Sequence, residues 1–161
     1  MNTIRFKACE DVNPKQIRLP VFATDGSGCF DFHAIEHCSF GMSRQSAVLR
    51  TGLIPEVPEG WVMLIFSRSG HGFKNDVRLS NCVGVIDSDY RAEIKVKLRA
   101  DTAGFFEVAQ GTAIAQGLLV PAPIWSIQVI LDQSVQLSET KRGAGGFGST
   151  DRKFFGQSKE N

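Results

Sequence analysis

Three short segments carry the side chains that could do chemistry in this chain of 161 residues. The first is Ser67-Arg68-Ser69-Gly70, which follows an apolar run. It offers a guanidinium, a hydroxyl and an open backbone N–H to one anion. The second is the segment 84–90, GVIDSDY, in which Asp87 follows three apolar residues. A carboxylate in such a place is costly unless it is paired or used, for instance as a general base.

The third segment is glycine-rich and covers residues 143–150, GAGGFGST. It nearly matches a P-loop, but Ser149 stands where the lysine belongs, and a P-loop also needs a strand before it and a helix after it. Its backbone N–H groups, its two hydroxyls and the neighbouring Arg142 still have phosphate-binding character. Taken singly, the first segment is better explained as an ordinary turn, and the second can equally be a hairpin turn capped by Asp87.

Strand patterns dominate the elements that must position these segments. Residues 93–99, EIKVKLR, alternate strictly between charged and apolar side chains. Predicted strands recur roughly every eight to fifteen residues with Gly, Pro, Asp or Asn between them, which is typical of an all-β sandwich, jelly roll or barrel. One short helix is expected near 71–77. The other predicted strands cover residues 30–35, 47–54, 61–66, 113–120 and 124–131.

From Ser138 onward the chain is polar, glycine-rich and without periodicity. We therefore expect a β-domain over residues 1–137 and a flexible C-terminal arm over 138–161. Two interpretations of this arm stay open. It is either a disordered tail or a segment that orders on a ligand or partner, as Phe147, Phe154 and Phe155 suggest.

Composition excludes several classes of protein. Lys and Arg number 18 against 17 Asp and Glu, so binding of nucleic acid or a membrane by bulk charge is not expected. No apolar run is long enough to span a bilayer, and the N-terminus lacks the apolar core of a secretion signal. The four cysteines form no CxxC pair, which predicts free thiols in a reducing cytoplasm. His33 and His37 would lie about 13 Å apart on a strand, so a shared metal is not expected.

In their order along the chain, five segments resemble the motifs of the trimeric dUTPase family. Any one of them could arise by chance, but five in the right order and spacing could hardly do so. The resemblance covers most of the chain. The five segments are 23–32 (ATDGSGCFDF), 67–70 (SRSG), 81–94 (NCVGVIDSDYRAEI), 114–116 (IAQ) and 142–150 (RGAGGFGST).

This resemblance implies a fold, an activity and an assembly. The fold would be a jelly-roll-like β-barrel of the dUTPase type, with a flexible C-terminal arm. The activity would be that of a dUTP diphosphatase, an enzyme that hydrolyses dUTP to dUMP and pyrophosphate with Mg²⁺. It would limit uracil incorporation into DNA and supply dUMP for dTMP synthesis. The assembly would be a homotrimer whose active sites are shared, with the arm of one subunit closing over another.

The resemblance also implies roles for single residues. Asp87 would orient and activate the attacking water, and Arg142 would stabilise charge from a neighbouring subunit's arm. Tyr90 would lie against the deoxyribose and leave no room for a 2′-hydroxyl. Asp31 would support Mg²⁺ through water, because most ligands of this ion come from substrate phosphates. The remaining substrate-binding residues would be Asn81, Val85, Ile86 and Lys95 near the uracil, Phe147 stacked on it, and Arg68, Ser69, Gly70, Gln116, Gly148, Ser149 and Thr150 on the phosphates.

Four positions depart from the family pattern, and we expect them to shift stability or affinity rather than abolish activity. They are Cys29, Ser67, Ala92 and Ala113. Two other functions stay open: a dCTP deaminase, which has a similar fold, and a non-catalytic nucleotide sensor. An additional protein partner also stays open. The expected location is the cytoplasm, or the host-cell cytoplasm if the chain is viral.

Overall fold

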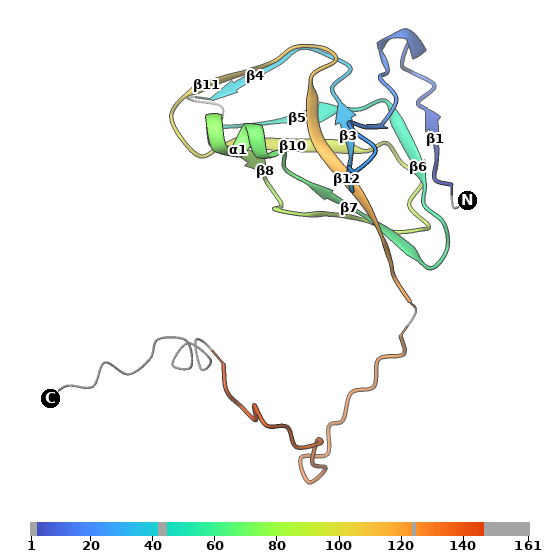
Figure 1. The fold of residues 1–161 in the computed structure, drawn as a ribbon, viewed down its shortest axis with the longest axis vertical. Helices are drawn as coiled ribbons and strands as arrows, with labels where there is room; N and C mark the ends of the chain where they lie inside the picture. Colours follow the sequence, from blue (N-terminus) through green and yellow to red (C-terminus); the bar gives the residue numbers. More distant parts are fainter. Residues whose placement is uncertain (1–2, 42–44, 124, 147–161) are drawn as a thin grey trace, which may run out of the picture. The chain divides into compact units, whose positions relative to one another are not determined.

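The computed structural model of the chain describes residues 3–41, 45–123 and 125–146. The chain divides into two compact units, residues 1–124 and 125–161. All strands and helices of the described residues lie in the first unit (Figure 1). The expected boundary between a β-domain over 1–137 and an arm over 138–161 stays a prediction.

The first unit is built almost entirely from short strands, as the sequence predicts. Its single α-helix, α1, covers Ser69–Asn75, and a 3₁₀ helix, η1, covers Pro14–Gln16. The strands are β1 (Arg5–Ala8), β2 (Val21–Phe22), β3 (Phe30–His33), β4 (Cys38–Gly41), β5 (Ser46–Arg50), β6 (Leu53–Glu56), β7 (Trp61–Phe66), β8 (Val77–Leu79), β9 (Gly84–Ile86), β10 (Lys95–Ala100), β11 (Phe105–Val108) and β12 (Ala113–Pro121).

The strands pair in four antiparallel groups. A five-stranded sheet has the order β2-β3-β12-β7-β9, and a three-stranded sheet has the order β5-β10-β8. Two further pairs, β1-β6 and β11-β4, complete the unit. Neighbours in the sheets are mostly distant in the sequence, as a jelly-roll-like barrel requires. The predicted all-β, jelly-roll-like fold is confirmed.

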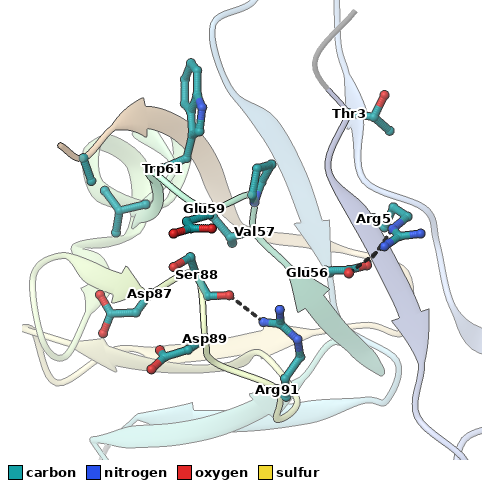
Figure 2. A pocket seen from close by; sticks show the side chains of 14 residues that line it. Thr3, Arg5, Glu56, Val57, Glu59, Trp61, Asp87, Ser88, Asp89 and Arg91 are labelled. Atoms are coloured by element: carbon teal, nitrogen blue, oxygen red, sulfur yellow. Dashed lines mark hydrogen bonds and ion pairs between the residues drawn. The ribbon is translucent and has the colours of Figure 1, made fainter. Parts of the chain in front are cut away.

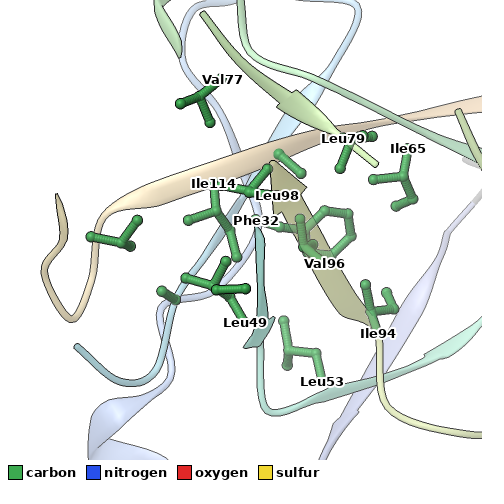
Figure 3. Packing of buried hydrophobic residues seen from close by; sticks show 14 of the residues in the cluster. Phe32, Leu49, Leu53, Ile65, Val77, Leu79, Ile94, Val96, Leu98 and Ile114 are labelled. Carbon is green, nitrogen blue, oxygen red and sulfur yellow. The ribbon is translucent and has the colours of Figure 1, made fainter. Parts of the chain in front are cut away.

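The core lies between these sheets, and strand periodicity explains its composition. In β10, Val96, Leu98 and Ala100 are buried, and the residues between them are exposed. Successive strand residues point to opposite faces, so the strict alternation in the sequence produces one apolar and one charged face. Figure 3 shows Val96 and Leu98 packed with buried side chains from other strands of the barrel. Among the largest fully buried side chains are Phe32, Leu49, Met63, Leu79, Ile94, Leu98 and Ile114.

A glycine on β12 permits the closest packing of this core. A Cβ atom at Gly117 would lie 2.8 Å from Cε2 of Phe30 and 2.9 Å from Cε2 of Phe32. These two rings meet edge to face, with their centroids 5.5 Å apart. The absence of a side chain at Gly117 therefore lets two phenylalanines rest directly on the strand.

Two predicted elements divide or end differently from what the sequence indicates. The range 47–54 is interrupted at Thr51 and Gly52, because Gly52 adopts a φ of +71° that ends β5 before β6 begins. The helix starts earlier than expected and ends where Asp76 adopts a left-handed conformation, so that Val77 already belongs to β8.

The predicted strand over 124–131 is wrong for its described residues, 125–131, which have no regular structure. Its apolar side chains are open to solvent, with Trp125 80% and Ile127 91% exposed. An apolar run forms a strand only when another strand pairs with it. Pro121 ends β12, and Pro123 follows it, so the run does not extend that strand.

No helix in the part of the chain that the structure describes is both long and apolar enough to cross a membrane.

Candidate active site

Residues from three sequence motifs line one cavity of about 490 Å³ on the first unit. Gly28, Cys29 and Asp31 come from the start of β3 and the loop before it. In the motif 67–70, Ser67 and Arg68 connect β7 to α1, and Ser69 and Gly70 begin the helix. The remaining motif supplies Gln116 from β12. The cavity therefore contains all four residues of the barrel that were predicted to bind phosphates: Arg68, Ser69, Gly70 and Gln116.

The pairing of β12 with both its neighbours explains this gathering. Gln116 lies opposite Asp31 on β3 and opposite Phe66 on β7. Its amide Nε2 donates a hydrogen bond to the main-chain oxygen of Ser67 at 2.9 Å. This bond holds the start of the Ser67–Gly70 turn against β12 at the mouth of the cavity.

Asp31 and Arg68 form an ion pair within the cavity. Arg68 Nε donates to Asp31 Oδ1 at 3.0 Å, and Nη2 donates to Oδ2 at 3.2 Å. The two side chains are partly buried, 35% exposed for Arg68 and 22% for Asp31. A two-point contact of this kind fixes the plane of the guanidinium as well as its position. The predicted role of Asp31 near a metal stays a prediction.

The departure at Ser67 has a structural role. Its hydroxyl accepts a hydrogen bond from the backbone N–H of Leu79 at 2.9 Å. This contact joins the end of β7 to β8, a connection that a proline at this position would lack. Another departing residue, Cys29, lines the cavity itself.

The predicted uracil-reading residues line a second cavity, of about 190 Å³. Asn81 precedes β9, Val85 and Ile86 lie on β9, and Lys95 begins β10. A Cβ atom at Gly84 would lie 3.1 Å from Cβ of Ile65 on β7. The glycine therefore allows β9 to lie close against β7 and shapes this narrow cavity.

Asp87 lies directly after β9 and lines a third cavity, of about 910 Å³ (Figure 2). The exposed turn that carries it is held by Arg91, whose Nη1 donates to the main-chain oxygens of Ser88 at 2.7 Å and Tyr90 at 2.9 Å. The Tyr90 hydroxyl donates to the main-chain oxygen of Glu93 at 3.0 Å. Asp87 is therefore placed at an open cavity by a turn with several internal bonds.

Two histidines beside the Asp31–Arg68 pair were not identified as site residues from the sequence. Burial lowers the pKa of His71, and Arg68 lowers it further while Asp31 opposes the shift. Burial also lowers the pKa of His33, against the opposing effect of Asp31. The Nδ1 atoms of both histidines are buried without a hydrogen-bond partner among the described residues. The position of His71 directly after the Ser67–Gly70 motif was the available signal. His37 instead forms a 2.8 Å contact with Glu107.

The predicted arm residues fall partly within the described structure. Arg142 Nε donates to the main-chain oxygen of Gly145 at 2.7 Å, and the N–H of Gly145 donates back to Arg142 at 3.1 Å. The start of the glycine-rich segment thus forms a compact turn. Phe147, Gly148, Ser149 and Thr150 lie outside the described residues, so their roles stay predictions.

A family model and individual known proteins both match most of this chain. A family model described as dUTPase matches residues 15–151. The deoxyuridine 5′-triphosphate nucleotidohydrolase of Brucella suis biovar 1 (strain 1330) is 40% identical over 143 residues, which cover 84% of this chain and 86% of that protein. The enzyme of the same name from Nautilia profundicola is 37% identical over 134 residues, covering 83% of this chain and 91% of that protein.

Solved structures agree in fold. The dUTPase of Staphylococcus bacteriophage 80alpha, determined with dUPNHPP, superposes with a TM-score of 0.77 at 24% identity, covering 92% of this chain and 98% of that one. A variant dUTPase from phage phi11 of S. aureus, which coordinates a structural Mg(II) ion, gives a TM-score of 0.69 at 19% identity, covering 83% of this chain and all of that one.

Proposed function

The chain belongs to the dUTPase family, and on that premise we propose that it is a dUTP diphosphatase in which Asp87 activates the attacking water. The enzyme hydrolyses dUTP. The observation that carries the site assignment is the cavity that joins Arg68, Ser69, Gly70 and Gln116 from separate motifs. In this proposal the products are dUMP and pyrophosphate. Removal of dUTP would limit uracil in DNA, and dUMP would serve dTMP synthesis in the cytoplasm.

The phosphate chain would bind in the cavity beside the Asp31–Arg68 pair. Arg68 donates from Nε and Nη2 to Asp31, which leaves the Nη1 N–H groups for a phosphate oxygen. Ser69 adds a hydroxyl, and Gly70 adds a backbone N–H without side-chain obstruction. Because the guanidinium is already oriented by Asp31, little reorganisation is needed when the substrate binds.

The base and sugar would bind at the turn after β9. Uracil would enter the cavity lined by Asn81 and β9, where the amide and backbone groups can pair with its edge. The narrow space supports selection against a base with an extra methyl group. The ring of Tyr90, 38% exposed, would lie against the deoxyribose.

Magnesium fits this site when most of its ligands come from the substrate. In the described residues, no group of three or more His, Cys, Asp or Glu side chains could hold a metal ion by itself. Among the described residues that line the proposed phosphate cavity, Asp31 is the one carboxylate, and its oxygens already accept hydrogen bonds from Arg68. Such an arrangement suits contact with hydrated Mg²⁺ through water. When bound, the ion would neutralise phosphate charge.

Asp87 would accept a proton from water as the water oxygen attacks and the bond to pyrophosphate breaks. The open cavity beside Asp87 gives water access to the carboxylate. Arg142 and the arm residues Phe147, Gly148, Ser149 and Thr150 would then close the site, covering the uracil and the terminal phosphates. A guanidinium supplied in this way stabilises the charge that develops as the bond breaks.

The proposed homotrimer with shared active sites agrees with the distribution of the site residues over separate cavities. Among the described residues, the cavities at Arg68, at Asn81 and at Asp87 have no lining residue in common. One triphosphate nucleotide must nevertheless reach all three sets of residues. Assembly of several copies would bring the phosphate cavity of one subunit to the Asp87 turn of another.

The direct test is product release. Incubation with dUTP and Mg²⁺ should yield dUMP and pyrophosphate in equal amounts, and a chelator should suppress the reaction. Asp87→Asn should lower turnover about 10²–10⁴-fold while dUTP binding is largely kept, because the amide cannot take the proton. Near-normal turnover by this variant would disprove the general-base assignment.

Shared sites can be tested by mixing two inactive variants. Asp87→Asn and Arg68→Ala, unfolded and refolded together in equal amounts, should regain activity at about a quarter of the sites if each site combines both residues from different subunits. Each variant refolded alone serves as the control. No recovery in the mixture would show that Asp87 and Arg68 of one chain act together.

A further inference from the structure

A buried carboxylate outside the three cavities is tied to the turn that carries Tyr90. The Tyr90 hydroxyl donates to the main-chain oxygen of Glu93 at 3.0 Å. The side chain of Glu93 is only 8% exposed, although the residues of the turn before it are largely exposed. A carboxylate so buried is costly unless its charge is compensated.

Glu93 is compensated by a set of contacts to the segment between β5 and β6. Arg50 Nε donates to both carboxylate oxygens, at 2.9 and 3.1 Å, and the backbone N–H of Gly52 donates to Oε1 at 2.9 Å. Arg50 is itself held by Asp11, at 2.9 Å. We call the contacts of Glu93 with Arg50 and Gly52 the Arg50–Glu93 clamp.

Backbone contacts extend this attachment to the next residue. The N–H of Ile94 donates to the oxygen of Leu53 at 2.9 Å, and the buried hydroxyl of Thr51 donates to the oxygen of Ile94 at 2.7 Å. By contrast, the side chains of Tyr90 and Arg91, which belong to the turn itself, donate hydrogen bonds only within residues 88–93 of the described structure. The turn is therefore attached to the barrel at both ends, by the pairing of β9 with β7 before it and by the Arg50–Glu93 clamp after it. The clamp acts on the residue whose main-chain oxygen accepts the hydrogen bond from the Tyr90 hydroxyl.

We propose that Glu93 is a positioning residue that fixes the Tyr90 ring and thereby sets discrimination between deoxyribose and ribose. The inference rests on the proposed function, in which Tyr90 lies against the sugar. The clamp fixes the Glu93 main chain, and the main-chain oxygen fixes the tyrosine hydroxyl. Exclusion of a 2′-hydroxyl by contact requires a ring that cannot retreat, so loosening the clamp admits ribonucleotides.

The test compares dUTP and UTP as substrates of three variants. Glu93→Gln keeps the shape of the side chain but removes its charge, and so weakens the contact with Arg50. Tyr90→Phe keeps the ring and removes only the hydroxyl that reaches Glu93. The control is Asp101→Asn, which removes the exposed 2.6 Å ion pair with Arg78 at the other end of β10.

Both Glu93→Gln and Tyr90→Phe should lower the ratio of kcat/KM for dUTP to that for UTP by about tenfold, with the gain appearing in UTP turnover. Asp101→Asn should leave the ratio unchanged. A Glu93→Gln variant that loses stability and dUTP turnover but keeps the ratio would overturn the proposal. If that variant does not fold, an unchanged ratio in Tyr90→Phe overturns it equally. Failure of the unmodified chain to release pyrophosphate from dUTP would instead refute the proposed function.

Discussion

Arg68 and Asp31 are 37 residues apart in the sequence and form a two-point ion pair, with nitrogen–oxygen distances of 3.0 and 3.2 Å. The pair exists because β12 lies between β3 and β7, so that the end of β7 is brought to the middle of β3. It holds the guanidinium in one orientation on the edge of a polar cavity. In the proposed site, the group that binds phosphate is therefore positioned by a residue that need not touch the phosphate.

Replacement of Arg68 by lysine tests this positioning. Lysine keeps the positive charge but cannot donate to both oxygens of Asp31 in one plane and also contact a phosphate. We expect kcat/KM for dUTP to fall about 10–100-fold, the equivalent of one charge-assisted hydrogen bond. The urea midpoint of unfolding should change little, because the pair is partly exposed. If the urea midpoint fell far enough that unfolding accounted for the lost activity, the result would contradict a specific role of the guanidinium.

Removal of residues 138–161 tests the predicted arm. The described strands all end by Pro121, so the shortened chain should keep the near-native circular dichroism and unfolding midpoint of the full chain. Hydrolysis of dUTP should fall about a thousandfold or more, because Arg142 and the phosphate-binding residues after it are lost. The single variant Arg142→Ala is the matched comparison for the guanidinium alone. Full activity in the shortened chain would refute the arm's catalytic role.

Gly117→Ala tests the close approach of the phenylalanine rings to β12. The added methyl group would meet Phe30 and Phe32 at less than 3.0 Å, so one ring or the strand must shift. The free energy of unfolding should decrease by about 1–3 kcal/mol, as is typical of overpacked cores. Gly26→Ala is the control, because a Cβ there meets no atom within 4 Å. Urea unfolding of both variants measures the difference, and equal free energies of unfolding would contradict overpacking at Gly117.

The pH dependence of stability follows from the lowered pKa of His71, which results first from burial and then from Arg68, against the effect of Asp31. Unfolded histidine titrates near pH ~6.5. Just below this value the unfolded chain binds more protons than the folded chain, so the free energy of unfolding falls as the pH decreases. This contribution to stability is complete above the pKa of His71 in the unfolded chain. It is lost as the pH falls toward the lower pKa of His71 in the folded chain.

Urea midpoints at pH ~7 and pH ~5.5 measure this effect. His71→Leu should reduce the difference between them, and His33→Leu should reduce it further, since burial lowers the pKa of His33 in the same direction. A His71→Leu protein with the full difference would show that other groups cause it.

Regular alternation made parts of the fold predictable. Each residue of β10 lies on the face that its place in the sequence indicates, because the backbone repeat of two leaves no other arrangement. The motif around Ser67–Gly70, selected by its residue types, and the motif around Asn81, selected by the family resemblance, each line a cavity. What they bind stays a prediction.

Other features depended on contacts that no local pattern encodes. The Asp31–Arg68 pair results from sheet order, which brings distant strands together. His71 is half-buried and packs its ring edge to face against Phe106 of β11. The apolar run at 125–131 is the reverse case, in which a local pattern predicts an element that these residues do not form in the structure. Its composition favours a strand, but its described residues have no strand beside them. The hydrogen bond that the Ser67 hydroxyl accepts from the N–H of Leu79 likewise joins two strands, and no local pattern predicts it.

Gln116 and Gly117 are consecutive residues of β12 and face opposite ways. Gln116 lines the cavity beside the Asp31–Arg68 pair, and Gly117 receives the rings of Phe30 and Phe32. The strand cannot slide or tilt to reposition the amide without disturbing the aromatic packing behind it. On heating, we therefore expect the geometry of this cavity to be lost together with the packing of the core. A shift of β12 alone would not produce a folded state in which only the cavity is altered.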